Sequence, residues 1–331
     1  MTEHYAIRIT QPGGPEVLGS HPITLAPPGP RELQIVQHAV GLDFIDVYHR
    51  SGLYPLPMPH GIGLEAAGVI TAVGEEVDER EFSLGERVVY LSRPPGAYAS
   101  ARNVPAEHCV VLPAAIGDEV AAASLLKGLT AEYLVHRVQT LAPGMRVLVH
   151  AAAGGTGTLL CQWLASYGVE VIGTVGSEAK AETALLNGCR DVVIDTSEDA
   201  KDLPAQVRAA GRQGPVQVVF DSIGRRTFTA SLGCLERRGM LVSFGNASGP
   251  PAPFDVLSLS SHGSLFLTRP TLFDYVATRA ELVHATARLF DAIASGTLRV
   301  PVHQRWPLRD AGEAHRALEA RETTGASVLI P

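Results

Sequence analysis

A glycine-rich turn between an apolar run and a helical pattern constrains this chain more than any other feature. Residues 147–151 predict a short buried strand, and apolar residues recur at helical spacing over 159–164. Between them, Ala152, Gly154 and Gly157 occupy the three small-residue positions of the dinucleotide fingerprint. The N–H groups of a helix that opens at such a turn face an anion, so the stretch predicts a pyrophosphate site. Taken alone, the motif also fits a tight turn in any α/β protein.

Length and composition exclude several classes of protein. The chain has 331 residues, of which 46% are hydrophobic and 18% charged, so we expect a globular protein of two domains. Its apolar runs are too short to span a bilayer. The formal net charge is −7 without a basic block, which disfavours a nucleic-acid surface.

Targeting and cysteine patterns point to a reducing compartment. The N-terminus lacks a basic region followed by an apolar core, so we expect no secretory signal. The four cysteines are scattered without Cys-x-x-Cys spacing, which suggests neither a disulfide framework nor a zinc site. We therefore expect a cytoplasmic protein.

The two parts of the chain differ in secondary-structure pattern. Up to about residue 125, short alternating runs are punctuated by Gly and Pro, which predicts an irregular β-barrel. A helix is expected at 121–138, followed by the fingerprint strand and five further strands. Those strands are predicted at 169–175, 191–195, 216–221, 239–244 and 264–268. Helices are predicted at 179–186, 203–210 and 227–237, so this part predicts a doubly wound parallel sheet. Two amphipathic helices, 281–295 and 311–321, and a short strand at 326–330 close the chain.

Five stretches together resemble the zeta-crystallin-like quinone oxidoreductases of the medium-chain dehydrogenase/reductase superfamily. They are Phe44-Ile-Asp-Val-Tyr-His-Arg-Ser-Gly-Leu-Tyr-Pro, Leu125-Leu-Lys-Gly-Leu-Thr, His150-Ala-Ala-Ala-Gly-Gly-Thr-Gly, Val242-Ser-Phe-Gly-Asn-Ala-Ser-Gly and Leu267-Thr-Arg-Pro. The resemblance runs nearly end to end, and the order and spacing of the motifs make it specific.

The resemblance implies a division into two domains. It predicts an α/β protein in which residues 1–127 and 269–331 form a GroES-like, irregular β-barrel catalytic domain. Residues 128–268 are predicted to form a Rossmann NADPH-binding domain, with the active cleft where the two domains meet. The return of the last 60 residues to the first domain follows from the resemblance alone.

The metal ligands of the related zinc alcohol dehydrogenases are missing from this sequence. Asp43 stands where those enzymes have a Cys, and Leu64 stands where they have a His. A catalytic zinc needs three protein ligands. His60 and Glu65 lie nearby in the sequence, but His60 follows a proline and is interpreted as a loop residue. The expected metal content is therefore none.

The chemistry that remains is hydride transfer, in which the cofactor carries the reaction and the protein supplies position and electrostatics. The resemblance implies that Asp43, Tyr48 and Tyr54 line the cleft beside the nicotinamide. Either tyrosine would donate a hydrogen bond to the quinone oxygen, or both would merely pack against loop prolines. Most relatives have Asn at position 43, and Asp cannot donate as Asn does unless it is protonated.

The expected cofactor is NADPH. NAD enzymes place a carboxylate about 20 residues after the glycines, whereas this chain has Thr174 there and Lys180 shortly after. By resemblance, Arg321 is the second partner of the 2′-phosphate. Asp195 replaces a Tyr common in the family, and with Glu178 it is expected to oppose the phosphate as a solvent-exposed carboxylate. The predicted cofactor-binding residues are Lys127, Thr130, Ala152, Gly154, Gly155, Thr156, Gly157, Gly176, Ser177, Lys180, Asp195, Ser222, Phe244, Gly245, Asn246, Leu267, Thr268, Arg269 and Arg321.

Three functions remain open. The leading hypothesis is a zinc-independent NADPH:quinone oxidoreductase, and a reductase of activated C=C bonds in enones or enoyl thioesters shares most of the motifs. The third is a non-catalytic role like that of a crystallin or an RNA-binding protein, and the acidic balance disfavours RNA binding. The apolar run at 264–268 predicts an edge strand that pairs with its copy in a homodimer.

Overall fold

The computed structural model describes residues 3–210 and 214–331. The chain folds into two compact units, Met1–Leu129 with Val276–Pro331, and Thr130–Tyr275.

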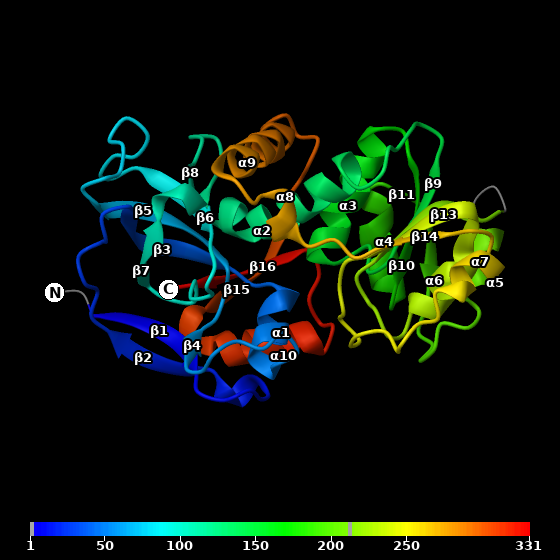
Figure 1. Ribbon diagram of the computed structural model, residues 1–331, viewed down its shortest axis with the longest axis horizontal. Helices are drawn as coiled ribbons and strands as arrows, with labels where there is room; N and C mark the ends of the chain where they lie inside the picture. The colour runs from blue at the N-terminus through cyan, green and yellow to red at the C-terminus, as the bar shows by residue number, and fades with distance from the viewer. Residues whose placement is uncertain (1–2, 211–213) are drawn as a thin grey trace. The chain divides into compact units, whose positions relative to one another are not determined.

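The unit Thr130–Tyr275 is built on one parallel sheet of six strands in the order β11-β10-β9-β12-β13-β14 (Figure 1). The strands are β9 (Arg146–Val149), β10 (Glu170–Val175), β11 (Cys189–Ile194), β12 (Val216–Asp221), β13 (Leu235–Ser243) and β14 (Phe266–Thr268). The order runs outward from β9 in both directions, which confirms the predicted doubly wound sheet. The strands are mostly buried apolar runs, as a parallel sheet covered by helices requires.

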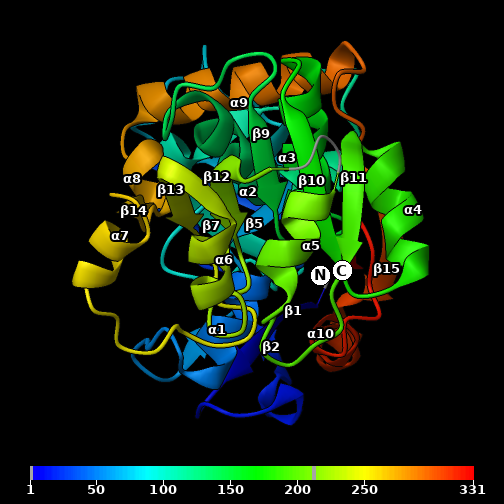
Figure 2. The same cartoon turned by 90° about the vertical axis from the view of Figure 1, so that its right-hand side faces the viewer.

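Helices connect the parallel strands of this unit (Figure 2). They are α3 (Gly155–Ser166), α4 (Glu178–Leu186), α5 (Leu203–Ala209), α6 (Phe228–Cys234) and α7 (Leu257–Ser261), while α8 (Leu272–Tyr275) follows the last strand. Helices α3 and α4 pack on β9, β10 and β11, while α5 packs on α6. The chain reverses its direction of travel after β11, so right-handed crossovers place the two helix pairs on opposite faces.

One predicted helix boundary is wrong. The sequence pattern extended a helix to Arg237, whereas α6 ends at Cys234 and β13 begins at Leu235. Leu235 is buried and pairs with Val216 of β12, so strand pairing and burial override the local helical pattern. Arg238 then adopts a left-handed conformation, with φ of 63°, inside a ladder whose register shifts.

The other unit is built on two sheets. The larger has seven strands, in the path β15-β16-β3-β5-β6-β8, with β7 also pairing β3, and the smaller has the order β2-β1-β4. The strands are β1 (His4–Ile9), β2 (Gly19–Ile23), β3 (Glu32–Gly41), β4 (His60–Gly61), β5 (Glu65–Val73), β6 (Arg87–Leu91), β7 (Ala101–Pro105), β8 (Cys109–Val111), β15 (Val302–Pro307) and β16 (Ala326–Ile330). Within the described residues the path ends at β15 and β8, so the strands form no closed barrel.

Long-range pairing joins the C-terminal segment to the first strands of this unit. The last strand, β16, pairs antiparallel with β3 through Leu329 and Val40. The helices and 3₁₀ turns are α1 (Phe44–Ser51), α2 (Asp118–His136), α9 (Arg279–Ala294), α10 (Ala311–Glu319), η1 (Pro15–Val17), η2 (Ala106–His108) and η3 (Leu308–Asp310). Helix α2 begins in this unit and ends in the other.

Candidate functional site

The glycine turn has the geometry that the fingerprint predicts. Gly154 is the N-cap of α3, and its N–H donates to the carbonyl oxygen of Ala151 at 2.9 Å. A Cβ on Gly157 would lie 2.2 Å from that same oxygen, so only glycine allows this approach of helix and strand. The first N–H groups of an α-helix have no acceptor within the helix. They therefore form a cradle that fits a pyrophosphate at the carboxyl end of β9.

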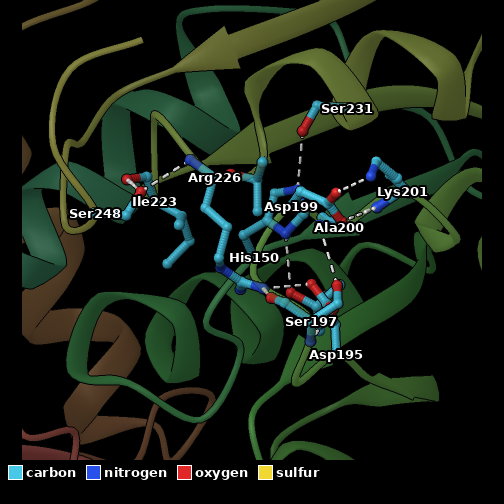
Figure 3. Close-up of polar contacts among 12 residues, drawn as sticks. His150, Asp195, Ser197, Asp199, Ala200, Lys201, Ile223, Arg226, Ser231 and Ser248 are labelled. Carbon is cyan, nitrogen blue, oxygen red and sulfur yellow. Dashed lines mark hydrogen bonds and ion pairs between the residues drawn. The ribbon is translucent and has the colours of Figure 1, made fainter.

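The position where NAD enzymes hold the ribose with a carboxylate is occupied by a buried threonine. Thr174 lies in β10 with an exposed fraction of 3%, and its Oγ1 lies 2.9 Å from Nδ1 of His150. The other ring nitrogen of His150 lies 3.0 Å from Oγ of Ser231 (Figure 3). Burial lowers the pKa of His150, so the imidazole is neutral and braces the ends of β9 and β10 against α6. After β10, Ser177 caps α4 by accepting a hydrogen bond from the N–H of Lys180.

Asp195 is not the exposed carboxylate that the sequence suggested. Its exposed fraction is 6%, and its Oδ2 lies 2.7 Å from Nη1 of Arg226. Oδ1 accepts hydrogen bonds from the backbone N–H and the hydroxyl of Ser197, at 3.1 and 2.6 Å. Asp195 is therefore a compensated charge, and the expectation of solvent exposure was wrong because Arg226 lies 31 positions further along the chain.

The predicted nicotinamide residues follow β12, β13 and β14. A Cβ on Gly245 would lie 2.5 Å from the carbonyl oxygen of Ser222, so the two loops approach closely only because position 245 is glycine. Arg269 donates from Nη1 to the carbonyl oxygen of Ser243 at 3.0 Å. Asn246 is 8% exposed. The other residues of this group are Phe244, directly after β13, and Leu267 and Thr268, both within β14.

The predicted catalytic residues lie in and around α1: Asp43 precedes it, Tyr48 lies within it and Tyr54 follows its end. Asp43 is the N-cap of α1 and forms a capping box with Asp46. The rings of Tyr48 and Tyr54 contact edge to face, with centroids 5.0 Å apart. Tyr48 is 7% exposed and also contacts the ring of Phe44. Both the packing role and the hydrogen-bonding role predicted for these tyrosines are compatible with this geometry.

A buried ionic cluster that the sequence did not predict surrounds Asp43. Nζ of Lys127 lies 2.7 Å from Oδ1 of Asp43 and 3.4 Å from Oε1 of Glu65, and none of the three side chains is more than 7% exposed. Burial and the charge of Asp43 raise the pKa of Glu65 well above its usual range. Although burial opposes its charge, the two carboxylates raise the pKa of Lys127. Two carboxyl groups share one ammonium in this cluster, and one of them belongs to Asp43, a predicted catalytic residue.

A second polar network fixes α1 to α10. The Tyr98 hydroxyl lies 3.0 Å from both Oδ2 of Asp46 and Nε2 of His315. Nδ1 of His315 in turn lies 3.1 Å from Nη1 of Arg50. Arg50 is 2% exposed and forms two hydrogen bonds of 2.8 Å with the carboxylate of Glu319. The pattern of short strands in this region gave no indication of these contacts.

Two predicted phosphate partners lie on different units. Lys180 is in the first turn of α4, while Arg321 follows α10 in a left-handed conformation with φ of 60°. The remaining candidate near the boundary, Thr130, lies in α2 and is 8% exposed. Whether these residues contact a nucleotide stays a prediction.

The part of the chain that the structure describes holds neither a metal-binding cluster nor a membrane-spanning helix. No group of three or more His, Cys, Asp or Glu side chains within residues 3–210 and 214–331 is placed to hold a metal ion. Over the same residues, no helix has both the length and the apolar character needed to cross a membrane.

Comparison with known proteins places the chain in a family. Residues 29–145 match the alcohol dehydrogenase GroES-like domain, and residues 155–289 match the zinc-binding dehydrogenase domain. Quinone oxidoreductase 1 of Escherichia coli K12 is 46% identical over 96% of this chain and 97% of its own length. A 2-haloacrylate reductase of a Burkholderia species is 40% identical over 98% of both chains.

Solved structures agree with the sequence matches. The structure of E. coli quinone oxidoreductase complexed with NADPH superposes with a TM-score of 0.94 at 45% identity, covering 99% of this chain and 100% of that one. The structure of a 2-haloacrylate reductase gives a TM-score of 0.83 at 39% identity, covering 99% of each chain. The chain belongs to the quinone oxidoreductase family of the medium-chain dehydrogenase/reductase superfamily, which combines a GroES-like domain with a Rossmann sheet.

Proposed function

We propose that the protein is a zinc-independent NADPH:quinone oxidoreductase, which transfers hydride from NADPH to quinones. The observation that carries the proposal is the glycine turn of α3 with Thr174, rather than a carboxylate, at the neighbouring strand end. A 2′-phosphate fits there because no carboxylate is placed to accept a hydrogen bond from a ribose 2′-hydroxyl. The E. coli relative whose structure contains NADPH supports the same choice.

In this proposal the chain binds and orients the cofactor, which supplies the hydride. The N–H groups at the start of α3 hold the pyrophosphate, and Lys180 and Arg321 neutralise the 2′-phosphate. Residues after β12, β13 and β14 hold the nicotinamide end, with Gly245 keeping the loops close. We further propose domain boundaries at residues 128 and 268.

The quinone is proposed to bind beside α1. A hydroxyl of Tyr48 or Tyr54 donates to the quinone oxygen as negative charge develops there. Asp43 is engaged by Lys127 at 2.7 Å, so it is a partner of that ammonium rather than a metal ligand. Leu64 offers no donor atom to a metal. A delocalised hydroquinone anion forms without a Lewis acid, so we propose that the enzyme uses no metal.

Reduction of an activated C=C bond is the second candidate, because a 2-haloacrylate reductase is 40% identical over nearly the whole chain. The test measures NADPH oxidation with benzoquinones and naphthoquinones, and with 2-chloroacrylate and simple enones. Rates without enzyme serve as the control, because quinones also react directly with NADPH. We expect kcat/KM for the best quinone to exceed that for the best alkene by roughly tenfold or more. A higher value with 2-chloroacrylate would select the second candidate, and no oxidation with any acceptor would refute both.

We also propose that the protein is a cytoplasmic homodimer that binds no nucleic acid. Strand β14 is the last in its sheet, and its residues Phe266 and Leu267 are 57% and 37% exposed. An apolar edge strand of this kind pairs with a copy of itself across a two-fold axis. Light scattering at micromolar concentration is expected to give twice the 35.0 kDa mass of one chain. A mass of one chain at that concentration would contradict the proposal.

A further inference from the structure

An ion pair lies across the carboxyl ends of the parallel strands (Figure 3). Asp195 follows β11, and Arg226 lies between β12 and α6. Besides its contact with Asp195 at 2.7 Å, Nη1 of Arg226 donates to the carbonyl oxygen of Ser197 at 2.9 Å. The two side chains are only 5% and 15% exposed, so the pair is little screened by water.

Hydrogen bonds hold both the side chain and the backbone of Arg226. Its backbone N–H donates to Oγ of Ser248 at 3.0 Å, and that hydroxyl donates to the carbonyl oxygen of Ile223 at 2.8 Å. Ser248 lies in the loop after β13. Arg226 thus joins the loops that follow β11, β12 and β13, and its side chain has a fixed place at this edge of the sheet.

The pair spans the strands where a dinucleotide binds. In the sheet order, β10 and β9 lie between β11 and β12. A guanidinium that starts after β12 and reaches Asp195 after β11 must therefore pass the ends of β9 and β10. His150, at the end of β9, is close enough to feel the charges of both Asp195 and Arg226. Ligands of open α/β sheets bind in the crevice outside these strand ends.

The charge state of the pair follows from its contacts. Although burial opposes ionisation, the hydrogen bond from Ser197 and the charge of Arg226 lower the pKa of Asp195. The carboxylate is ionised at neutral pH, and the Asp195 and Arg226 charges partly offset each other. Removing Arg226 leaves an uncompensated negative charge at this edge of the sheet, and removing Asp195 leaves an uncompensated positive one. Thr174, at the same edge, carries no charge.

We propose that Arg226 adds to the preference for NADPH over NADH that Lys180 and Arg321 provide, with Asp195 as the residue that holds it in place. Its guanidinium, fixed over the strand ends, supplies positive potential to the 2′-phosphate of NADPH, and Asp195 limits that potential. The inference rests on the proposed function only in requiring that a nicotinamide dinucleotide binds at this edge.

The test compares dissociation constants for NADPH and NADH, measured by fluorescence titration, in four proteins. These are the unmutated protein, Arg226→Gln, Asp195→Asn and the double variant. Arg226→Gln is expected to raise the dissociation constant for NADPH by about tenfold, because one charged interaction is lost. The dissociation constant for NADH should change little. Asp195→Asn is expected to raise the preference for NADPH, and the double variant to return toward the unmutated ratio. Because the pair is little exposed, the differences should shrink only modestly as salt rises.

A neighbouring ion pair provides a matched control. Lys201 lies 2.6 Å from Asp199 in the same loop region, but the two side chains are 82% and 49% exposed. Lys201→Gln removes the same charge as Arg226→Gln, and it is expected to leave both dissociation constants unchanged because water screens the site.

The outcomes separate the inference from the proposed function. If the unmutated protein binds neither nucleotide, the proposed function fails. If the unmutated protein binds both nucleotides, and Arg226→Gln raises the two dissociation constants by the same factor, Arg226 has only a structural role and the inference is overturned. If Arg226→Gln fails to fold, Asp195→Asn decides the matter, because structural damage cannot strengthen NADPH binding relative to NADH. An unchanged or lower preference in Asp195→Asn overturns the inference.

Discussion

Replacing Lys127 by Met is expected to lower the free energy of unfolding by about 3–5 kcal/mol, the usual cost of removing one partner of a buried ion pair. The variant leaves Asp43 and Glu65, 4% and 0% exposed, without their shared cation. Met has a similar volume, so little of the effect comes from a cavity. Urea unfolding followed by circular dichroism measures the loss.

The loss should depend on pH in a defined direction. Burial and the charge of Asp43 place the pKa of Glu65 in the folded protein well above its unfolded value. Between those two values the folded protein binds more protons than the unfolded chain, so this group lowers stability as pH rises. The Lys127 ammonium lowers the pKa of Glu65, so its removal raises that pKa further, and the destabilisation in Lys127→Met is expected to be greater at pH 8 than at pH 5. Other groups around the cluster include Asp46, whose pKa is raised by burial and by Asp43.

Two further variants test the cause of this loss. Lys201→Met removes a lysine from an exposed pair with Asp199, and no measurable change in stability is expected. Adding Asp43→Asn and Glu65→Gln to Lys127→Met removes the uncompensated carboxyl groups, so part of the stability should return. An equal loss in the triple variant would mean that packing of the lysine stem, rather than its charge, stabilises the site.

The parallel sheet was predictable because its signals are local. Strands β9, β10 and β12 are short, mostly buried runs that are each followed by a helical pattern, and the glycine turn marks the first crossover. In the other unit, α1 and β15 were not predicted. Helix α1 has only eight residues, and it depends on a capping box between Asp43 and Asp46. Strand β15 has no fully buried residue, and it is defined by parallel pairing with β16. Pairing between distant segments leaves no periodic pattern in the sequence.

The same distinction separates the predicted site residues from the missed ones. The residues that form the turn at Gly154 and Gly157 lie close together in the sequence, so its geometry could be predicted from a local pattern. The Glu65–Lys127 contact joins residues 62 positions apart, so their charges gave no sign that they share one buried site. Asp195 was misjudged for the same reason, because a carboxylate at a strand end is expected to be exposed unless its partner is known.

Replacing Gly157 by Ala is expected to raise the dissociation constant for NADPH by roughly 100-fold, the cost of misplacing binding groups by about an ångström. The added Cβ would lie 2.2 Å from the carbonyl oxygen of Ala151 and 3.0 Å from Cα of Ala152. Both obstacles are backbone, and Ala151 already has a left-handed φ of 51°, so the turn has little freedom to yield. The start of α3 must move away from β9, taking the pyrophosphate cradle with it.

The matched control for this variant is Gly117→Ala. Gly117 is exposed, its φ is not positive, and a Cβ there would meet nothing within 4 Å. The Gly117→Ala variant should bind NADPH like the unmutated protein. Gly157→Ala is expected also to lose about 1–3 kcal/mol of stability from overpacking. Fluorescence titration with NADPH and urea unfolding of both variants give the two quantities. If Gly157→Ala binds NADPH as tightly as Gly117→Ala, the pyrophosphate does not lie at the start of α3, because the clash moves that helix terminus whatever else it does.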